Sequence, residues 1–286
     1  MAEQTRDASA YCADLVRTHD FPCYASTLFL PGVHRRPMLA IYAFNAEISR
    51  IRDQVSQPLP GEMRLQWWID MLSGRDHGGV EGNPVASELS WAIRTWRLPV
   101  ERLARLVEEH EFDLYNDPMP SLAALEGYAN DTTAALFACC ARILVRPSEA
   151  IDHLARHAGL AYAMIEVINT LPQDLARRQL FVPLQFLQQH GSSLEEVLRG
   201  KQTPQARAGI DLLLEEAREH LKTALSLLAT VPAEVRPAFL PLALVRRDIK
   251  RMSRADNDPF APRPMPRVRM LWALWRASRS PEFKSE

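Results

Sequence analysis

One stretch, residues 33–53 (VHRRPMLAIYAFNAEISRIRD), limits the folds open to this chain more than any other. Its apolar residues recur at three- and four-residue spacing, and additional isoleucine and phenylalanine side chains extend the apolar surface around most of the helix. Such a helix must be buried on most sides, at the centre of a helical bundle. Asn45, Ser49 and Asp53 lie four residues apart, so we expect them to share one face and to border a cavity between helices.

The rest of the chain favours an all-α fold in one domain. Segments with helical periodicity alternate with loops that contain proline or glycine, and no segment has the period-two alternation of a half-buried strand. Nothing in the middle has the composition of a linker, so we predict a single domain over residues 1–286 with loose ends at 1–8 and 280–286. The predicted helices besides the central one are 9–17, 21–30, 62–72, 84–96, 99–114, 121–144, 148–171, 184–190, 193–199, 203–228, 242–252 and a last one around 270–275.

Composition and terminal sequence exclude several classes of protein. The 34 basic residues nearly balance the 35 acidic ones, so no overall field favours nucleic acid as a partner. Four cysteines form no zinc-binding spacing, and no apolar run approaches the roughly 18 residues of a membrane-spanning helix. The first residues have no signal-peptide pattern. We therefore predict a cytoplasmic, bacterial protein, with peripheral contact at the inner membrane as an alternative and a mitochondrial location only for a processed form.

Two features leave alternatives open. His153 and His157 lie four residues apart, where they could hold a metal, although a solvated helix surface is the more common setting for such a pair. The last helix, RVRMLWALWRASR, combines tryptophan and leucine with arginine. This composition is typical of a helix at a membrane interface or in a partner's groove, and equally of a helix that caps the bundle.

Two arginine pairs are candidates for an anion site. Arg35 and Arg36 open the central helix, and Arg177 and Arg178 follow the helix that begins near residue 148. Guanidinium groups bind phosphate oxygens through two parallel hydrogen bonds, and a helix N-terminus adds a favourable dipole. Ordinary solvent-exposed arginines are the alternative interpretation.

The order of these segments resembles that of the squalene/phytoene synthase family. Residues 27–31 (TLFLP), the pair Arg35 and Arg36, and residues 41–44 (IYAF) are similar to the opening signature of the family. Residues 174–183 (DLARRQLFVP) resemble its D-A-R-R-G-R-I-Y-L-P segment. The resemblance implies the all-α isoprenoid synthase fold, a trans-prenyltransferase-like helical bundle around a deep central cavity.

Active members of the family condense two prenyl diphosphates head to head, using Mg²⁺ held between two aspartate-rich helices. The first family motif, D-D-x-x-D, falls on Ser49, Arg50 and Asp53 in this chain, and the second, D-x-x-x-D, falls on Thr170 and Asp174. Each helix therefore keeps one motif carboxylate, and we expect Arg50 to compete with a magnesium ion at the first site.

The resemblance also implies roles for individual residues. In an active protein, Asp53 and Asp174 would be catalytic and would bind Mg²⁺ together with Glu166. A larger set would contact the substrate or its diphosphate: Arg35, Arg36, Tyr42, Asn45, Glu47, Arg50, Glu166, Thr170, Arg177 and Arg178.

Three shorter segments resemble one branch of the family more specifically. Residues 43–47 (AFNAE), 52–56 (RDQVS) and 63–68 (MRLQWW) are similar to the branch that contains the mitochondrial respiratory complex I assembly factor, which has lost aspartates at the same places. We therefore predict a non-catalytic or diverged member that acts in complex I (NADH dehydrogenase) assembly, with assembly partners and a retained isoprenoid ligand. The alternatives are an active Mg²⁺-dependent phytoene- or squalene-type synthase that uses prenyl diphosphates, and a plain helical interaction protein without a cavity.

Overall fold

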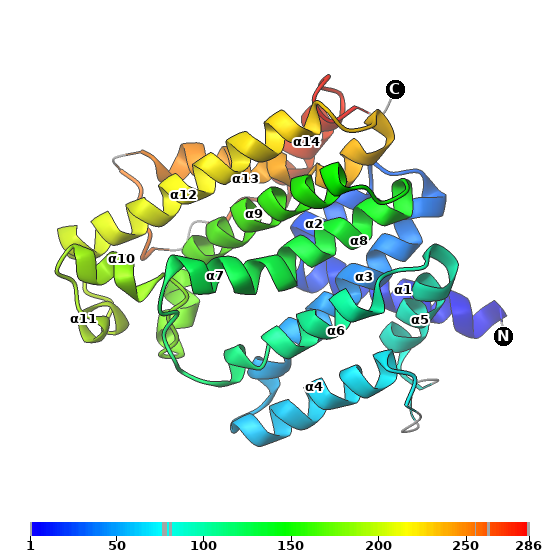
Figure 1. Ribbon diagram of the computed structural model, residues 1–286, viewed down its shortest axis with the longest axis horizontal. Coiled ribbons are helices and arrows are strands. Elements are labelled where there is room, and N and C mark those ends of the chain that lie inside the picture. The colour runs from blue at the N-terminus through cyan, green and yellow to red at the C-terminus, as the bar shows by residue number, and fades with distance from the viewer. Residues whose placement is uncertain (1, 76–78, 80–81, 255, 262–263, 285–286) are drawn as a thin grey trace.

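The computed structural model describes residues 2–75, 79, 82–254, 256–261 and 264–284, and the regular elements of this part are all helical (Figure 1). The predicted all-α class is therefore confirmed. The elements are α1 (Ala2–His19), α2 (Phe21–Thr27), α3 (Gly32–Ser49), η1 (Ile51–Gln54), α4 (Pro58–Leu72), α5 (Pro84–Trp96), α6 (Val100–Glu109), η2 (Phe112–Leu114), α7 (Leu122–Ala129), η3 (Asn130–Ala134), α8 (Ala135–Leu144), α9 (Glu149–Ala176), α10 (Leu184–Gln189), α11 (Leu194–Leu198), α12 (Pro204–Leu228), η4 (Ala233–Phe239), α13 (Leu242–Met252) and α14 (Arg267–Ser278).

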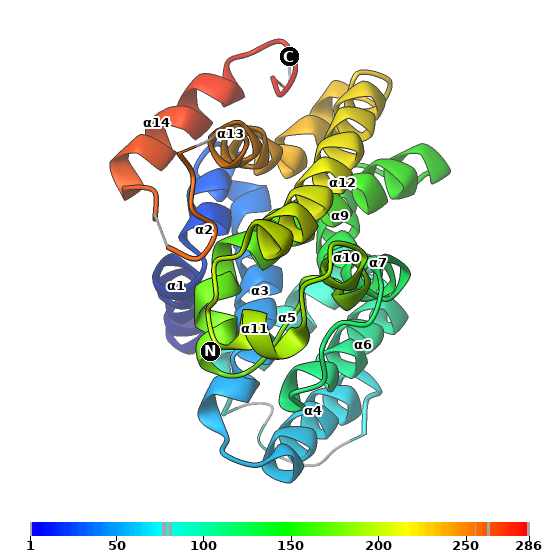
Figure 2. The ribbon, with the colours of Figure 1, turned by 90° about the vertical axis from the view of Figure 1, so that its left-hand side faces the viewer.

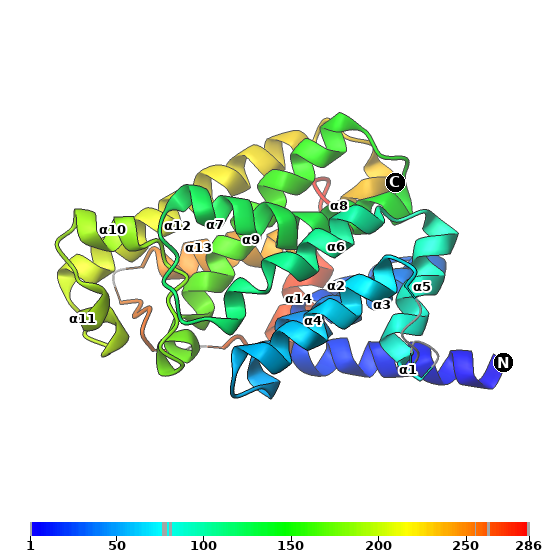
Figure 3. The same cartoon turned by 60° about the horizontal axis from the view of Figure 1, so that its bottom comes forward.

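Two long helices organise the bundle. α9 runs through its middle with α12 along one side, and it also packs against α8 and α13 (Figures 1 and 2). α3 packs against α1, α5 and α8, so that α8 contacts both of these central helices. α4 packs on the outside of α6, and α6 in turn packs against η3 and α8 (Figure 3). The C-terminal end of α9 and the end of α3 are thereby brought to the same side of the molecule as η1.

The central helix is buried as predicted, but it ends earlier than the sequence indicates. Residues 37–44 of α3 are all buried, in keeping with the apolar surface that surrounds this helix. The α-helix stops at Ser49, and Ile51–Gln54 forms the tighter 3₁₀ turn η1. The expected single face of Asn45, Ser49 and Asp53 is therefore wrong, because a 3₁₀ turn has about three residues per turn and rotates Asp53 out of the α-helical row.

α9 differs from prediction in the opposite direction. Pro172 was expected to end the helix, yet α9 continues through it to Ala176. Proline removes one backbone donor and crowds the carbonyl of the preceding turn, but packing on both sides compensates for that loss here. The extra turn carries Asp174, whose side chain is buried. The predicted helix 121–144 is divided by the π-helical turn η3 into α7 and α8.

Small residues allow α9 to approach η3 closely. A Cβ atom added at Gly159 would lie 2.3 Å from the Cα atom of Ala134. This separation is far below van der Waals contact, and the obstacle is backbone rather than a movable side chain. Only glycine fits at this crossing.

Described residues near both chain ends take part in the fold, while the looseness of 1–8 and 280–286 stays a prediction. The first helix begins at Ala2 instead of residue 9. Near the other end, Phe283 is buried, and Glu282 forms an ion pair of 2.8 Å with Arg246 of α13, so the described residues 280–284 are held against the bundle. Among the described residues, no helix is both long and apolar enough to cross a lipid bilayer.

Replacement of Gly159 by alanine tests the close crossing of α9 and η3. We expect Gly159→Ala to lower the free energy of unfolding by about 1–3 kcal/mol, because the backbone must shift to admit the methyl group. Gly127→Ala is the matched control, since Gly127 is also helical and an added Cβ there meets nothing within 4 Å. The control should gain about 0.4–1 kcal/mol from reduced freedom of the unfolded chain. Urea denaturation of both variants makes the comparison, and equal effects would contradict the predicted crossing.

Candidate functional site

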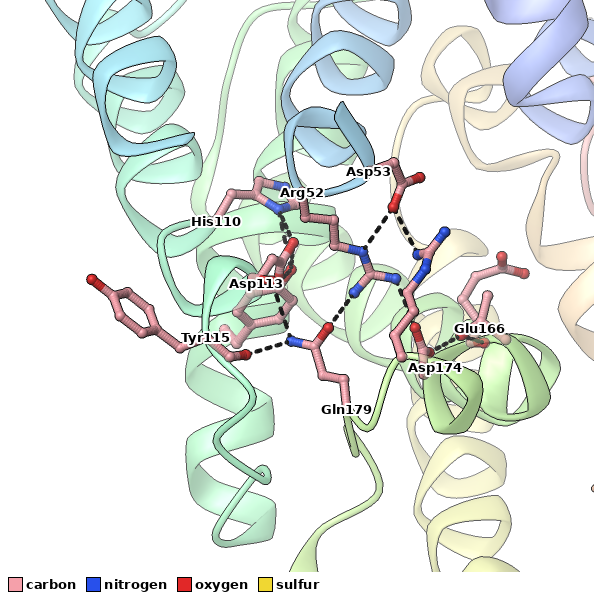
Figure 4. A network of polar contacts seen from close by, with 11 residues as sticks. Arg52, Asp53, His110, Asp113, Tyr115, Glu166, Asp174 and Gln179 are labelled. Atoms are coloured by element: carbon pink, nitrogen blue, oxygen red, sulfur yellow. Dashed lines mark hydrogen bonds and ion pairs between the residues drawn. The ribbon is translucent and has the colours of Figure 1, made fainter. Parts of the chain in front are cut away.

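The centre of the site is a buried ion pair between Arg52 of η1 and Asp174 of α9 (Figure 4). One guanidinium nitrogen of Arg52 donates to Asp174 Oδ1 over 2.6 Å, and the other donates to Gln179 Oε1 over 2.9 Å. The side chains of Arg52 and Asp174 are 17% and 3% exposed. The two family motifs are thus joined by an arginine.

Both surviving motif carboxylates have cationic partners. Asp53 Oδ1 lies 2.8 Å from Arg177 and 3.7 Å from Arg52. The second oxygen of Asp174 accepts a hydrogen bond of 2.7 Å from Thr170 Oγ1. Arg52 thus lies between the two carboxylates and uses oxygens that a metal ion bridging them would need (Figure 4).

A second group of buried polar side chains holds Arg52 in place. Gln179 is buried and its amide nitrogen donates to the backbone carbonyl of Tyr115 over 3.2 Å, which turns its oxygen toward Arg52. Asp113 is also buried, and it accepts hydrogen bonds from Tyr128 Oη at 3.0 Å and bonds His110 Nδ1 at 2.6 Å. Burial alone would lower the pKa of Arg52, but the negative charges of Asp113 and Asp174 outweigh it, so this pKa is raised.

These contacts do not fit magnesium. Mg²⁺ demands near-octahedral oxygen ligands at about 2.0–2.1 Å, and a competing guanidinium on the same oxygen both blocks and repels it. Among the described residues, no group of three or more His, Cys, Asp or Glu side chains could hold a metal ion. Arg50 was predicted to be the competing cation, but Arg52 makes the contacts with Asp174 and lies beside Asp53. The assignment of Asp53, Asp174 and Glu166 as metal ligands stays a prediction, and this geometry opposes it.

The arginines predicted to bind an anion are engaged in other contacts. Arg36 donates two hydrogen bonds of 2.8 Å to the buried carboxylate of Glu88 and stacks over Trp91 at 4.0 Å, so it joins α3 to α5. Arg35 donates to Tyr24 Oη over 3.3 Å. Arg178 lies 3.6 Å from Glu195 on the surface. Within the described part of the chain, these residues serve structural contacts.

The remaining predicted residues of the first motif lie apart from the Arg52 site. Tyr42 is buried in the core. Its burial, and to a smaller extent the nearby Cys140 thiol, raises the pKa of Tyr42 well above the ordinary value. Asn45, Glu47 and Arg50 are half-buried on α3. The backbone N–H of Asp53 donates to the Arg50 carbonyl over 3.0 Å, but no side-chain hydrogen bond or ion pair between described residues joins these three to Asp53 or Asp174.

A pocket of about 280 Å³ opens beside the second motif, between α9, α13, Pro22 and residues 264–270. Asn169 donates to Glu166 at 3.4 Å and accepts from Arg251 at 2.9 Å, and Arg251 also binds Asp248 at 3.2 Å. Glu166 lines this pocket and is itself an exposed residue, although many protein atoms surround its carboxyl group. This crowding by protein atoms, together with the charges of Asp20 and Asp248, raises its pKa to about 7.

The histidine pair on α9 joins a third histidine from α12. His157 Nδ1 lies 2.8 Å from His220 Nδ1, and His157 Nε2 lies 3.1 Å from His153 Nε2. Since the two nitrogens of His157 point to different neighbours, the three rings do not converge on one point. Burial and the adjacent His220 lower the pKa of His157 to about 4.

Comparison with known proteins matches this architecture to a family. The sequence pattern of squalene/phytoene synthase covers residues 16–276. The chain belongs to the squalene/phytoene synthase family. A crystal structure of a dehydrosqualene synthase in complex with ligand superposes with a TM-score of 0.82 at 14% identity, over 96% of this chain and 97% of that one. The predicted isoprenoid synthase fold is therefore confirmed.

Two relatives show which branches of the family are similar. A protein of Rattus norvegicus named NADH dehydrogenase (ubiquinone) complex I, assembly factor 6, is 33% identical over 256 residues, covering 90% of this chain and 77% of the relative. A phytoene synthase of Thermus thermophilus is 27% identical over 209 residues, covering 71% and 69% of the two chains. The resemblance to the assembly-factor branch is thus confirmed.

Sequence reasoning missed Arg52, Gln179 and Asp113 as members of the site. Arg52 and Gln179 lie directly inside the segments that carried the resemblance, residues 52–56 and 174–183. The sequence did contain one indication of the role of Arg52. It places an arginine directly before the surviving Asp53, at a position where the family motif specifies no residue. Asp113 gave no such signal, because its partner Tyr128 lies 15 positions away on α7 and only the fold brings the two side chains together.

Removal of Arg52 should be costly because it leaves Asp174 buried without a cation. We expect Arg52→Met to lower the free energy of unfolding by about 3–5 kcal/mol, the usual penalty for breaking one side of a buried ion pair. Arg177→Met is the matched control, since its side chain is 45% exposed and pairs with the surface-accessible Asp53; its loss should be under about 1 kcal/mol. Guanidinium chloride denaturation followed by circular dichroism measures both. Similar losses for the two variants would show that Arg52 is not the central cation.

Proposed function

We propose that this protein does not condense prenyl diphosphates and that it acts in the assembly of a respiratory complex I-type NADH dehydrogenase. The observation that carries the first part is the ion pair of 2.6 Å between Arg52 and Asp174, with Arg177 on Asp53. Head-to-head condensation needs a divalent cation to neutralise the departing diphosphate. A guanidinium held by buried carboxylates supplies a fixed positive charge but leaves no oxygen ligands for that ion.

Support for the assembly role comes from the relative of Rattus norvegicus and from the arrangement of charges. That protein is named a complex I assembly factor and matches 90% of this chain at 33% identity. Assembly requires stable surfaces and partners rather than bond making. The buried arginine bridges stiffen the junction between η1 and the end of α9, and this stiffness suits a protein that presents a fixed surface to assembly partners.

The pocket beside α9 is the proposed location for a retained isoprenoid ligand. Apolar side chains of Ile165, Leu244, Val245 and Met270 line one part of it, and the polar residues around Glu166 line another. Its volume of about 280 Å³ lies just below the range for small-molecule sites, roughly 300–1,000 Å³. Such a volume favours one compact ligand over the two prenyl diphosphates that condensation requires.

An active Mg²⁺-dependent prenyltransferase is the second candidate. Glu166, Thr170 and Asp174 follow one another at one-turn spacing on α9, as in an acidic motif, and a phytoene synthase is among the relatives. This function requires Arg52 and Arg177 to leave Asp174 and Asp53 when substrate enters. If turnover is observed, Asp174→Ala should abolish it.

Incubation with substrate separates the two candidates. We expect purified protein with Mg²⁺ and radiolabelled farnesyl or geranylgeranyl diphosphate to release no diphosphate and form no hydrocarbon product, because Arg52 blocks the metal position. Product and protein-bound label are scored separately, with an active phytoene synthase as the positive control. Retained label without product supports a ligand pocket without condensation. Mg²⁺-dependent product overturns the proposal and supports the prenyltransferase.

Deletion of the gene in its native organism tests the assembly role. We expect loss of NADH:quinone oxidoreductase activity and of the assembled complex on native gels, while succinate oxidation is retained. The deciding experiment is complementation with Asp53→Asn, a nearly isosteric change. It removes a carboxylate that a metal ion would need, but the interactions it weakens within the protein are only a half-exposed ion pair with Arg177 and a longer contact with Arg52. Under the proposal it restores the activity as wild type does. Normal complex I in the deletion strain, or failure of a stably folded Asp53→Asn protein to complement, contradicts it.

A further inference from the structure

The last helix, α14, has apolar side chains on two opposite faces. It lies at the edge of the molecule, where it packs against α2 and α13 (Figure 2). Leu274 and Ala277 point inward and are buried. On the outer side, Val268, Trp272 and Trp275 are 77%, 55% and 44% exposed. At 100° per residue these three fall within about 60° of one another and form one stripe along the helix.

Arginines border this stripe. A groove of about 1,020 Å³ between α13 and α14 has five arginines in its lining, namely Arg246, Arg247, Arg269, Arg276 and Arg279. Glu282 is the one carboxylate among its lining residues, and it pairs with Arg246 at 2.8 Å. The other four arginines form no ion pair with any described residue. Five positive charges against one negative leave an excess of four on this side of a chain whose net charge is −1.

The arginines and tryptophans are positioned together. The guanidinium of Arg279 lies 4.4 Å from the ring centre of Trp275, and that of Arg276 lies 5.7 Å from that of Trp272. Stacking of this kind keeps the cations next to the apolar stripe instead of spreading them into solvent. Capping of the bundle accounts for the inner face of α14, but it gives no reason for the outer one.

We propose that α14 and the adjacent arginines of α13 form a docking surface for an anionic phospholipid bilayer. We define the α14 surface as Val268, Trp272, Trp275, Arg247, Arg269, Arg276 and Arg279. Tryptophan rings settle at the level of lipid headgroups, and arginine binds phosphate oxygens with two hydrogen bonds. A helix with an apolar stripe bordered by cations lies flat in such an interface. No hydrogen bond or ion pair between described residues joins this surface to Arg52, Asp53 or Asp174, so docking does not depend on whether condensation occurs.

A bilayer fits these observations better than nucleic acid. A duplex would use the four unpaired arginines, but it would leave the 77%-exposed Val268 and the outer edge of Trp272 in water. Lipid covers both. The attraction must weaken with salt, because the arginines act through charges that ions screen over about 8–10 Å.

Vesicle flotation with the full-length protein tests this proposal. We expect binding to vesicles of equimolar phosphatidylcholine and phosphatidylglycerol, and little binding to pure phosphatidylcholine. The triple variant Arg269→Gln/Arg276→Gln/Arg279→Gln should weaken binding about a hundredfold, at roughly fivefold for each arginine. Trp272→Ser/Trp275→Ser should weaken it about tenfold and remove the blue shift of tryptophan fluorescence on vesicle addition.

Matched controls distinguish the α14 surface from general charge and apolarity. Arg94→Gln/Arg146→Gln/Arg156→Gln removes three exposed arginines elsewhere, and Leu59→Ser/Met63→Ser removes exposed apolar side chains of α4. Both controls should bind vesicles as wild type does, and circular dichroism should show all variants folded. Absence of vesicle binding, equal losses in the α14 and control variants, or a preference for duplex DNA over anionic vesicles would each overturn the proposal.

Discussion

The structure of the site depends on one buried guanidinium. Arg52 forms an ion pair with Asp174, donates a hydrogen bond to the side-chain oxygen of Gln179 and lies beside Asp53. Its positive charge thus balances the negative charges of the two carboxylates, as a divalent ion does between two acidic motifs. A cation that is part of the chain differs from a metal in two respects. It cannot be released or exchanged, and its N–H donors all lie in one plane, whereas a divalent ion accepts oxygen ligands from several directions.

This interaction requires the local backbone that surrounds it. Arg52 can reach α9 because α3 ends at Ser49 and the chain tightens into η1. Asp174 is in position because α9 continues past Pro172 for one more turn. α9 itself is fixed against the π turn η3 through the contact of Gly159 with Ala134. The ion pair of Arg52 and Asp174 therefore depends on three local irregularities: the 3₁₀ turn after α3, the proline within α9 and the π turn that α9 packs against.

The sequence predicted the frame better than the contacts. The apolar surface of residues 33–53 and the family-like segments were enough for an all-α isoprenoid synthase fold, because helical periodicity and segment order depend on local pattern. The role of Arg36 could not be predicted, since its partner Glu88 lies 52 positions away on α5 and was not distinguished by any pattern. Arg52 was missed for a related reason: an arginine side chain reaches far, and its target was decided by where α3 stopped.

Arginine in this protein occurs in two physical states, and the difference indicates where interactions with other molecules take place. Arg36 and Arg52 are bound to buried carboxylates, so their charges are cancelled within the fold and attract little from outside. Arg269, Arg276 and Arg279 are exposed and have no such partner among the described residues, so their field extends into solvent. The two surviving motif carboxylates are likewise paired with arginines, so little net charge remains at their site. Along α14, in contrast, exposed arginines without an ion-pair partner among the described residues lie next to the exposed rings of Trp272 and Trp275.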